Sequence, residues 1–298
     1  MPDTKKPEAY KYLPSKMADH LRNLEISVRK RMDGGMQGQH RSSTFGSSVE
    51  FAEYRPYIQG DPIERIDWTV YARTDRYVIR RFHDEVNIRA NILLDTSESM
   101  AYSAGGPMSK IEYGSYLAAA LMFIMVNQGD SASMMTFDND LRDIYEPAGT
   151  FGDLKPMLRG LEDLQPQRES NVEQALRKAA ELIKGHSLVV VISDLLQDPR
   201  ETLRGIGNLC YDGQDVTVFH VLDPAEIRLP DEGMIRVEFL ESRDRMSVDI
   251  AEFRELYIQR VREYLDEVRI GCTNEGADYI LVDTATDIHD ALLKRATV

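Results

Sequence analysis

The most constraining feature of the sequence is a pair of short apolar runs that each end abruptly in oxygen-bearing side chains. The first covers residues 92–94 and leads into Asp95-Thr96-Ser97-Glu98-Ser99, and the second covers residues 188–192 and leads into Ser193-Asp194. Short continuous apolar runs are typical of strands that are buried on both faces of a parallel sheet. Ligand sites in such sheets lie at the carboxyl ends of the strands. The two runs therefore predict a parallel sheet with a polar site at one edge.

From residue 88 onward, strand-like and helix-like segments alternate along the chain. The predicted strands cover residues 92–95, 131–137, 188–193, 216–222 and 278–282, with 141–145 as an edge hairpin strand beside 131–137. The predicted helices cover residues 110–128, 172–184, 199–210, 250–271 and 288–296. Strands separated by helices indicate a mostly parallel sheet with helices on both faces. We therefore expect one α/β domain over residues 88–298, with an irregular, strand-like insertion at about 224–250.

The residues before this domain fall into two regions. Residues 1–40 contain one helix pattern, at 15–32, followed by a glycine-containing segment at 33–38 that we expect to be flexible. Residues 41–87 contain short strand-like pieces separated by turns, which predict a small β-rich subdomain.

Composition narrows the class of partner and the compartment. The net charge is −14, which argues against nucleic acid as the main partner because phosphate binding needs a basic surface. The two cysteines, Cys210 and Cys272, form no disulfide framework and fit a reducing compartment. The N-terminus has no apolar signal core, and the longest apolar run, at 116–126, is shorter than the ~18 residues that suggest a membrane span. We therefore expect a cytoplasmic protein without membrane insertion.

The loop after the first apolar run contains one carboxylate and two hydroxyls at alternate positions, Asp95, Ser97 and Ser99. Hard oxygen donors of this kind are the ligands that Mg²⁺ and Mn²⁺ prefer. The simpler interpretation is a solvated loop with two capping serines. Donors from other strand ends are therefore needed to support a metal site.

Two further loops supply such donors. Asp194 follows the second apolar strand, and Ser170 precedes the helix predicted at 172–184. Each also has an interpretation as a helix cap, since Asp is a good N-cap and Ser170 with Glu173 has the spacing of a capping box. The sequence leaves both possibilities open.

Taken in order, the three loops resemble the metal-ion-dependent adhesion site of von Willebrand factor A domains, over about residues 88–298. The resemblance implies a von Willebrand A-like, Rossmann-like fold whose Mg²⁺ or Mn²⁺ ligands would be Asp95, Ser97, Ser99, Ser170 and Asp194. Ser170 stands where the family usually has Thr, so the hydroxyl is kept but the methyl group that restricts its rotamer is lost. Neutral hydroxyl ligands would leave much of the ion's charge available to an acidic group of a partner.

A second resemblance rests on residues 50–73, a segment dense in arginine, aspartate and aromatic residues. It is similar to the signature of the family known as domain of unknown function fifty-eight, which combines it with a C-terminal von Willebrand A-like domain. The signature residues that we single out here are Arg55, Asp61, Arg65, Asp67, Trp68 and Arg73. We expect the two aspartates to pair with the arginines and to lock the subdomain against the sheet; direct binding of a partner is the alternative.

This second resemblance also implies a partner. Members of the family are commonly paired with MoxR-type AAA+ ATPases and are thought to act as adaptors or chaperone-like partners. Many of them begin with membrane helices, whereas this chain resembles the short, soluble form.

Three functions are compatible with these residues. We favour a non-enzymatic, metal-dependent protein-binding module that acts as an adaptor of a MoxR-type ATPase and binds an acidic group through the ion. The alternatives are a metal-assisted hydrolase or phosphatase, and a structural domain with an empty site. An aspartyl-nucleophile phosphatase usually has a second carboxylate at the position of Ser97, and the chain has no phosphate-binding glycine loop or nucleophile elbow. No histidine pair has a zinc spacing, and we expect His220, in an apolar strand, to be a core residue.

Overall fold

The computed structural model of the 298-residue chain divides into two compact units. The larger one, here called the α/β unit, comprises residues 1–29 and 88–298, and the smaller one, the hairpin unit, comprises residues 30–87. The structure describes residues 10–26, 49–61, 63–84, 88–166, 170–228, 234–238 and 245–296.

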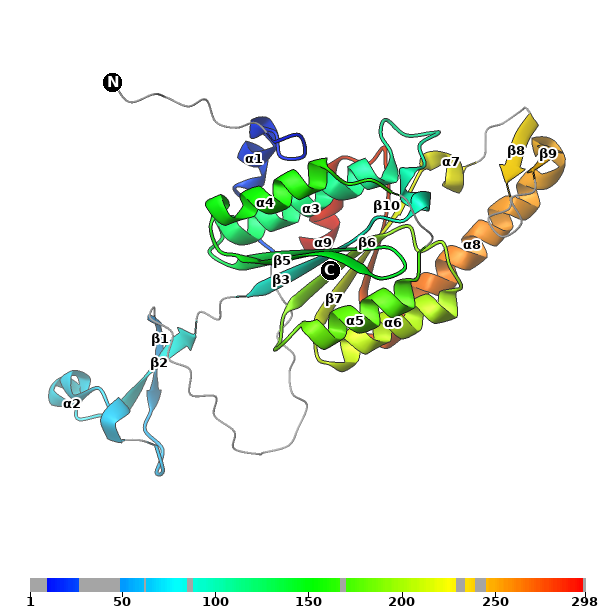
Figure 1. Cartoon of the computed structure of the whole chain (residues 1–298). Coiled ribbons are helices and arrows are strands. Elements are labelled where there is room, and N and C mark those ends of the chain that lie inside the picture. The colour runs from blue at the N-terminus through cyan, green and yellow to red at the C-terminus, as the bar shows by residue number, and fades with distance from the viewer. Residues whose placement is uncertain are drawn as a thin grey trace, which may run out of the picture. The chain divides into compact units, whose positions relative to one another are not determined.

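The α/β unit is built on a six-stranded sheet with the order β10-β7-β6-β3-β4-β5 (Figure 1). Its strands are β3 (Arg89–Asp95), β4 (Ser131–Phe137), β5 (Leu141–Ala148), β6 (Leu188–Ser193), β7 (Asp215–Leu222) and β10 (Asp278–Asp283). All neighbours are parallel except β4 and β5, which form an antiparallel hairpin at one edge. If the six strands of this sheet are renumbered 1 to 6 in chain order, their order from β5 to β10 is 3-2-1-4-5-6, which is that of doubly wound α/β folds. The fold class predicted from the sequence is confirmed.

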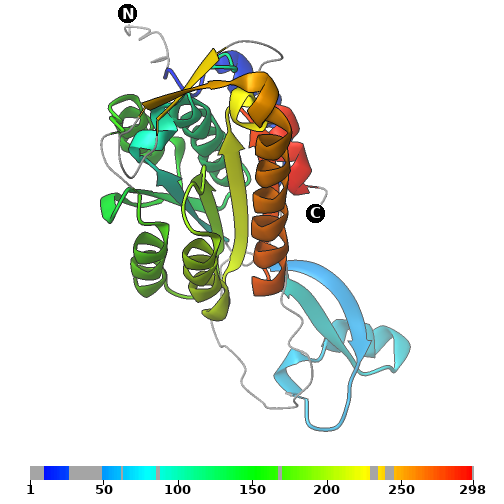
Figure 2. The ribbon, with the colours of Figure 1, turned by 90° about the vertical axis from the view of Figure 1, so that its right-hand side faces the viewer.

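Helices cover both faces of this sheet (Figure 1). One face carries α1 (Ser15–Leu21), α3 (Lys110–Asn127), α4 (Phe151–Glu162) and α9 (Ile288–Ala296). The other face carries α5 (Val172–Leu182), α6 (Pro199–Tyr211) and α8 (Ile250–Glu275), with α8 lying beside α6 (Figure 2). Among the described residues, no helix combines the length and the apolarity needed to cross a bilayer.

The connection from β7 to α8 contains the insertion expected at about 224–250. It consists of the short helix α7 (Pro224–Ile227) and an antiparallel hairpin of β8 (Met234–Glu238) and β9 (Arg245–Asp249). Helix α7 begins with a capping box, because the Asp223 side chain accepts from a backbone N–H of α7 while Glu226 accepts from the Asp223 N–H. The turn after β7 is thereby fixed beside the end of the strand.

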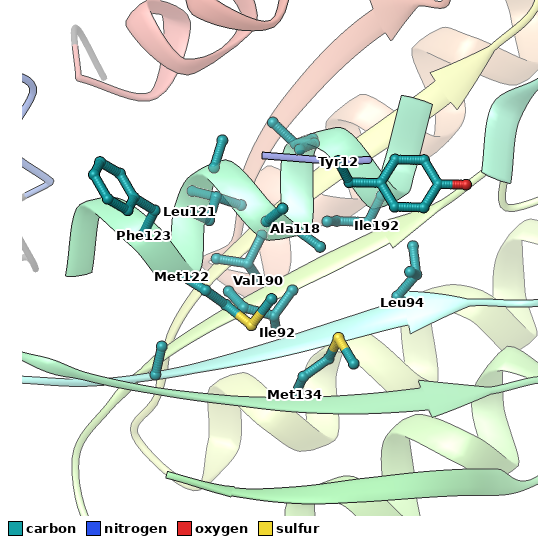
Figure 3. Packing of buried hydrophobic residues seen from close by; sticks show 14 of the residues in the cluster. Tyr12, Ile92, Leu94, Ala118, Leu121, Met122, Phe123, Met134, Val190 and Ile192 are labelled. Carbon is teal, nitrogen blue, oxygen red and sulfur yellow. The ribbon is translucent and has the colours of Figure 1, made fainter. Parts of the chain in front are cut away.

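The larger hydrophobic core lies between α3 and the sheet. Helix α3 begins with a capping box at Ser109, continues for 18 residues and is followed by Gly129 with φ of 91°, a conformation typical of a helix C-terminus. The close view shows side chains of β3, β6 and α3 packed together, among them Ile92, Leu94, Ala118, Leu121, Val190 and Ile192 (Figure 3). Each fully buried aliphatic side chain contributes about 1.5–3 kcal/mol. This packing holds the carboxyl ends of β3 and β6 in place.

The hairpin unit contains β1 (Val49–Pro56) and β2 (Val78–Asp84), which pair antiparallel. The 3-10 turn η1 (Ile63–Arg65) and the helix α2 (Trp68–Thr74) connect the two strands. A turn follows β1 at Gly60, whose φ of 110° favours glycine. The region expected to be β-rich is therefore a hairpin with a helix in its connection.

Two parts of the fold differ from the sequence-based expectation. The helix predicted over 15–32 ends at Leu21, because the following residues leave the helix and bury Ile26, whose N–H donates to Oε1 of Gln128 (3.1 Å). Residues 27–32 of that prediction, and the segment 33–38 that was expected to be flexible, lie outside the described residues. Helix α4 was not predicted, since Pro156 in its middle is a helix-breaking signal. Tyr10, Leu21 and Ile26 are buried in the core of the α/β unit, so the N-terminal segment belongs to that unit.

Candidate functional site

The candidate site lies at the carboxyl ends of β3 and β6, the neighbouring strands at which the winding of the sheet reverses. Asp95 is the last residue of β3, and Asp194 directly follows β6. Ser170, just before α5, places its Oγ 3.4 Å from Oδ2 of Asp95. The structure thus brings together the three loops that were singled out in the sequence.

Asp95 forms the buried centre of the site. It is 0% exposed; its Oδ1 accepts from the N–H of Ser97 (2.8 Å), and its Oδ2 accepts from the hydroxyls of Ser193 (2.6 Å) and Ser170 (3.4 Å). Burial raises the pKa of Asp95 to about 7, the charge of Asp194 adds to the shift, and the hydrogen bonds from Ser193 and Ser97 oppose it. A positive charge at this place would stabilise the ionised carboxylate.

Ser97 and Ser99 present two hydroxyl oxygens beside Asp95. Their Oγ atoms are 3.1 Å apart. In an octahedral Mg²⁺ site with metal–oxygen distances of about 2.0–2.1 Å, neighbouring ligand oxygens are separated by about 2.9 Å. The spacing of the two hydroxyls therefore fits adjacent ligands of one ion.

The interpretation of Ser170 and Asp194 as helix caps is wrong. Helix α5 is capped by Asn171, whose side chain accepts from a backbone N–H of its first turn (3.0 Å). Helix α6 is capped by Asp198 in the same way (2.8 Å). Other residues take the capping roles, while the Ser170 hydroxyl contacts Asp95 and the Asp194 carboxylate contacts Lys110.

Asp194 is bound to a lysine. Its Oδ2 accepts from Nζ of Lys110 (2.8 Å), which also donates to Oε1 of Glu226 (2.7 Å), and its Oδ1 accepts from the N–H of Leu196 (3.3 Å). Lys110 is the first residue of α3 and is 0% exposed. Burial by itself would lower the pKa of Lys110, but the two carboxylates outweigh it and raise this pKa above its usual value.

The backbone after β6 is held by neighbouring elements. The Asp194 carbonyl lies 2.8 Å from Nε2 of His220, whose Nδ1 lies 2.7 Å from the Tyr279 hydroxyl. A carbonyl only accepts, so Nε2 carries the proton and Nδ1 accepts from Tyr279. Leu195 is buried with φ of 49°, a left-handed conformation that costs a non-glycine residue about 1–2 kcal/mol, and its carbonyl accepts from the Tyr264 hydroxyl of α8. His220 is the buried, hydrogen-bonded core residue that the sequence predicted.

The loop between η2 (Glu98–Ala101) and α3 borders the site and is fixed by Asp223. The carboxylate of Asp223 accepts from the N–H groups of Ala104 (3.1 Å), Gly105 (2.7 Å) and Gly106 (3.2 Å). A Cβ on Gly106 would lie 1.9 Å from Oγ1 of Thr284, so this close approach requires glycine. The loop is therefore held rigidly against the turns that follow β7 and β10.

Two large apolar side chains on the loops of the site are exposed. Tyr102 follows η2 and is 44% exposed, and Leu196 follows Asp194 by two positions and is 41% exposed. The Tyr102 ring centroid lies 5.7 Å from Nζ of Lys110. Exposed apolar side chains beside a buried polar centre are features that a protein partner can cover.

The donor set is unusual for a metal site because it is poor in carboxylates. Over the described part of the chain, no group of three or more His, Cys, Asp or Glu side chains is placed to hold an ion. Asp95 and Asp194 are the two carboxylates of the candidate site, and its other donors are hydroxyls. An ion here would depend on Ser97, Ser99 and Ser170 for the rest of its protein ligands.

The signature residues of the hairpin unit form local contacts. Arg55 and Asp61 make a two-point ion pair, with Nη2–Oδ1 and Nη1–Oδ2 distances of 2.9 Å each. Asp67 caps α2 by accepting from its backbone N–H groups (2.9 and 3.3 Å), and it also accepts from the Tyr54 hydroxyl (3.0 Å). One predicted Asp–Arg pair is thus present, while the contacts described for Asp67 are a helix cap and a tyrosine.

The other signature residues lie on or near α2. Trp68 is 53% exposed, and its ring meets that of Tyr71 edge-on at 6.0 Å. Tyr71 in turn stacks on Tyr77 at 4.4 Å. Arg73 is exposed, and the side chain of Arg65 lies outside the described residues.

Residues 53–266 match the family described as Protein of unknown function DUF58. The chain belongs to the DUF58 family. The match begins within the signature of the hairpin unit and extends through most of the α/β unit, so the family expected from the sequence is confirmed.

The chain is also similar to individual sequences and solved structures. Uncharacterized proteins of Mycobacterium tuberculosis and Mycobacterium bovis are 28% identical over 232 residues, which cover 76% of this chain and 72% of theirs. Similar solved structures include the conserved hypothetical protein BatB from Bacteroides thetaiotaomicron (16% identity, TM-score 0.45, 71% of this chain and 100% of that one). They also include the SpRpn10 VWA domain (12% identity, TM-score 0.41, 70% of this chain and 95% of that one).

Three residues of the site were not singled out from the sequence: Lys110, Ser193 and Glu226. Lys110 could have been recognised in the sequence, because a cation at the N-terminus of a helix is disfavoured by the helix dipole and needs a specific partner. Glu226 stands three positions after Asp223 in a capping-box spacing, which explains one of its carboxylate oxygens and leaves the other for Lys110. Ser193 gave no signal beyond its place at the end of an apolar strand.

Proposed function

We propose that this DUF58 protein is a non-enzymatic, divalent-metal-dependent protein-binding module. The observation that carries the proposal is the meeting of oxygen donors from three separate loops at the carboxyl ends of β3 and β6, with Ser97 Oγ and Ser99 Oγ 3.1 Å apart. Asp95, Ser97, Ser99, Ser170 and Asp194 would hold a Mg²⁺ or Mn²⁺ ion. When bound, the ion would supply a partly uncompensated positive charge, because most of its protein ligands are neutral hydroxyls.

The residues around the ion would receive an acidic side chain of a protein partner. Ser99 and Ser170 are partly exposed, so the site opens to the surface on that side. Tyr102 and Leu196 present exposed apolar area beside it, which a partner can bury around the central charged contact. We infer that this partner is a MoxR-type AAA+ ATPase, as the family resemblance implies.

The geometry supports binding better than hydrolysis. Asp95 is 0% exposed and both of its oxygens accept hydrogen bonds, so it is poorly placed to attack a substrate. His220 is fully buried and its two ring nitrogens contact the Asp194 carbonyl and Tyr279, so it cannot activate Ser97 or Ser99 as a base. A hydrolase would need a nucleophile aligned with a base, and these contacts provide none between the named residues.

Calorimetric titration with Mg²⁺ and Mn²⁺ tests the ion site. We expect the wild type to bind and the variant S97A/S99A to lose at least about tenfold in affinity. Ser103→Ala, at an exposed position of the adjacent loop, is the matched control and should bind like the wild type. Negligible binding by the wild type, or equal binding by all three proteins, would refute the proposal. Steady turnover of phosphate or acyl esters that Asp95→Asn abolishes would favour the hydrolase instead.

A pull-down with a purified MoxR-type ATPase of the same organism tests the partner. We expect the complex to form in Mg²⁺, to dissociate in EDTA, and to be lost in Leu196→Asp although that variant still binds Mg²⁺. Leu182→Asp changes a comparably exposed leucine at the end of α5 and should leave the complex intact. A complex that is indifferent to both EDTA and Leu196→Asp would show that the partner does not bind through this site.

A further inference from the structure

Lys110 is the most unusual charged residue of the α/β unit. Its side chain is 0% exposed, although lysine is almost never fully buried without a partner. It also stands in the first turn of α3, where the helix dipole disfavours a cation. Both features indicate that a lysine stands at position 110 because of specific contacts of its side chain and not because it favours helix formation.

The contacts of the ammonium group identify its role. Nζ lies 2.8 Å from Oδ2 of Asp194 and 2.7 Å from Oε1 of Glu226, so it bridges a proposed ion ligand and a carboxylate of the α7 turn. The remaining oxygen of Asp194 accepts, among the described residues, a long hydrogen bond from the N–H of Leu196 (3.3 Å). Lys110 therefore fixes one oxygen of Asp194, and the proposed ion would be bound through the other.

The charges of the site and of the ion pairs made by Lys110 can be counted. In the ion-bound state, a cation would keep Asp95, Asp194 and Glu226 ionised, and these three negative charges with the one positive charge of Lys110 would sum to −2. Asp223, the next carboxylate along the chain from Glu226, is compensated separately by four backbone N–H groups. The sum is the opposite of the charge of one divalent ion.

We propose that Lys110 is a positioning residue that sets the charge of this site at −2 and thereby matches it to a divalent ion. The inference rests on the proposed function and specifies how the site selects its ion. Without the ammonium, Asp194 and Glu226 would add an uncompensated charge, and the site would favour a more highly charged ion. The number of charged ligands is a main determinant of how tightly oxygen sites bind cations.

Competition between Mg²⁺ and Tb³⁺ tests this inference, with terbium luminescence as the readout. Lys110→Met keeps the length of the side chain and removes the charge, and K110M/E226Q restores the sum to −2. We expect K110M to raise the ratio of Tb³⁺ affinity to Mg²⁺ affinity by about tenfold or more over that of the wild type. In K110M/E226Q this ratio should return most of the way to the wild-type value. Lys155→Met, at an exposed position of α4, is the control and should leave the preference unchanged.

A further variant keeps the test decisive if K110M does not fold. Glu226→Gln retains the contact between Lys110 and Asp194 but changes the sum to −1, so it should shift the preference away from Tb³⁺. If Lys110 acted only in folding, K110M and E226Q would not shift the preference for Tb³⁺ in opposite directions. Wild-type binding with unchanged preference in all variants would overturn this inference and leave the proposed ion site standing. Ion binding by K110M but not by the wild type would show that the ammonium occupies the place of the ion, which overturns both.

Discussion

The burial of His220 predicts a specific loss of stability in mild acid. The imidazole is 0% exposed, and burial lowers its pKa from 6.5 to about 4. The unfolded chain therefore binds a proton between these two pH values that the folded protein does not bind. Stability is fully present above about pH 6.5 and decreases as the pH falls toward 4. At about 1.4 kcal/mol per pKa unit, the loss from this one group is about 2 kcal/mol at pH 5 and about 3 kcal/mol at pH 4.

Urea unfolding in EDTA, at pH 7.5, 6, 5 and 4, measures this contribution. His220→Gln is the comparison, because its amide can donate to the Asp194 carbonyl and accept from Tyr279 but cannot titrate. The free energy of unfolding of the wild type should fall by about 2 kcal/mol more than that of His220→Gln between pH 7.5 and 5. His20→Gln, at an exposed position, should follow the wild type. Parallel curves for the wild type and His220→Gln would refute the assignment of a buried, neutral His220.

Three further changes have expected outcomes. Ser193→Ala removes the 2.6 Å hydrogen bond to Asp95 and should lower the free energy of unfolding at pH 7.5 by about 2 kcal/mol, whereas an unchanged urea midpoint would contradict the contact. Asp67→Ala removes the cap of α2 and should cost about 1 kcal/mol, measured as faster amide exchange in that helix; Asp67→Asn, which keeps an acceptor, should exchange nearly like the wild type. Gly106→Ala forces a Cβ to 1.9 Å from Thr284 and should lower the melting temperature by several degrees, and the second change Thr284→Ala should recover part of that loss.

The strands could be predicted because each buried strand is a short apolar run with a clear end. The run before Asp95 and the run before Asp194 occupy neighbouring positions in the sheet, as the parallel arrangement predicts. Helix α4 could not be predicted in this way, because Pro156 argues against a helix and only packing against α3 and β5 overrides that signal. The end of α1 at Leu21 is likewise set by packing, since burying Ile26 requires an extended chain.

The five proposed ion ligands could be located from the sequence, but their surroundings could not. Whether Ser170 caps a helix or faces Asp95 depends on a competition with Asn171 that local spacing does not decide. The contact between Lys110 and Asp194 joins residues 84 positions apart, and no local pattern encodes it. The compensation of charges inside the site therefore could be recognised only in the folded structure, where the loops lie side by side.

The candidate site also has a consequence for the order of events in folding. Asp95 meets Ser170 across a sequence separation of 75 residues, and the proposed ligand Asp194 directly follows β6, so no fragment that ends before β6 contains the complete ligand set. An ion that needs all of these ligands cannot bind the unfolded chain or an early intermediate tightly. Its full binding free energy would then stabilise the native state, by about 2.7 kcal/mol when the ion is present at 100 times its Kd. Release of the ion could serve as a direct signal that the central strands have separated.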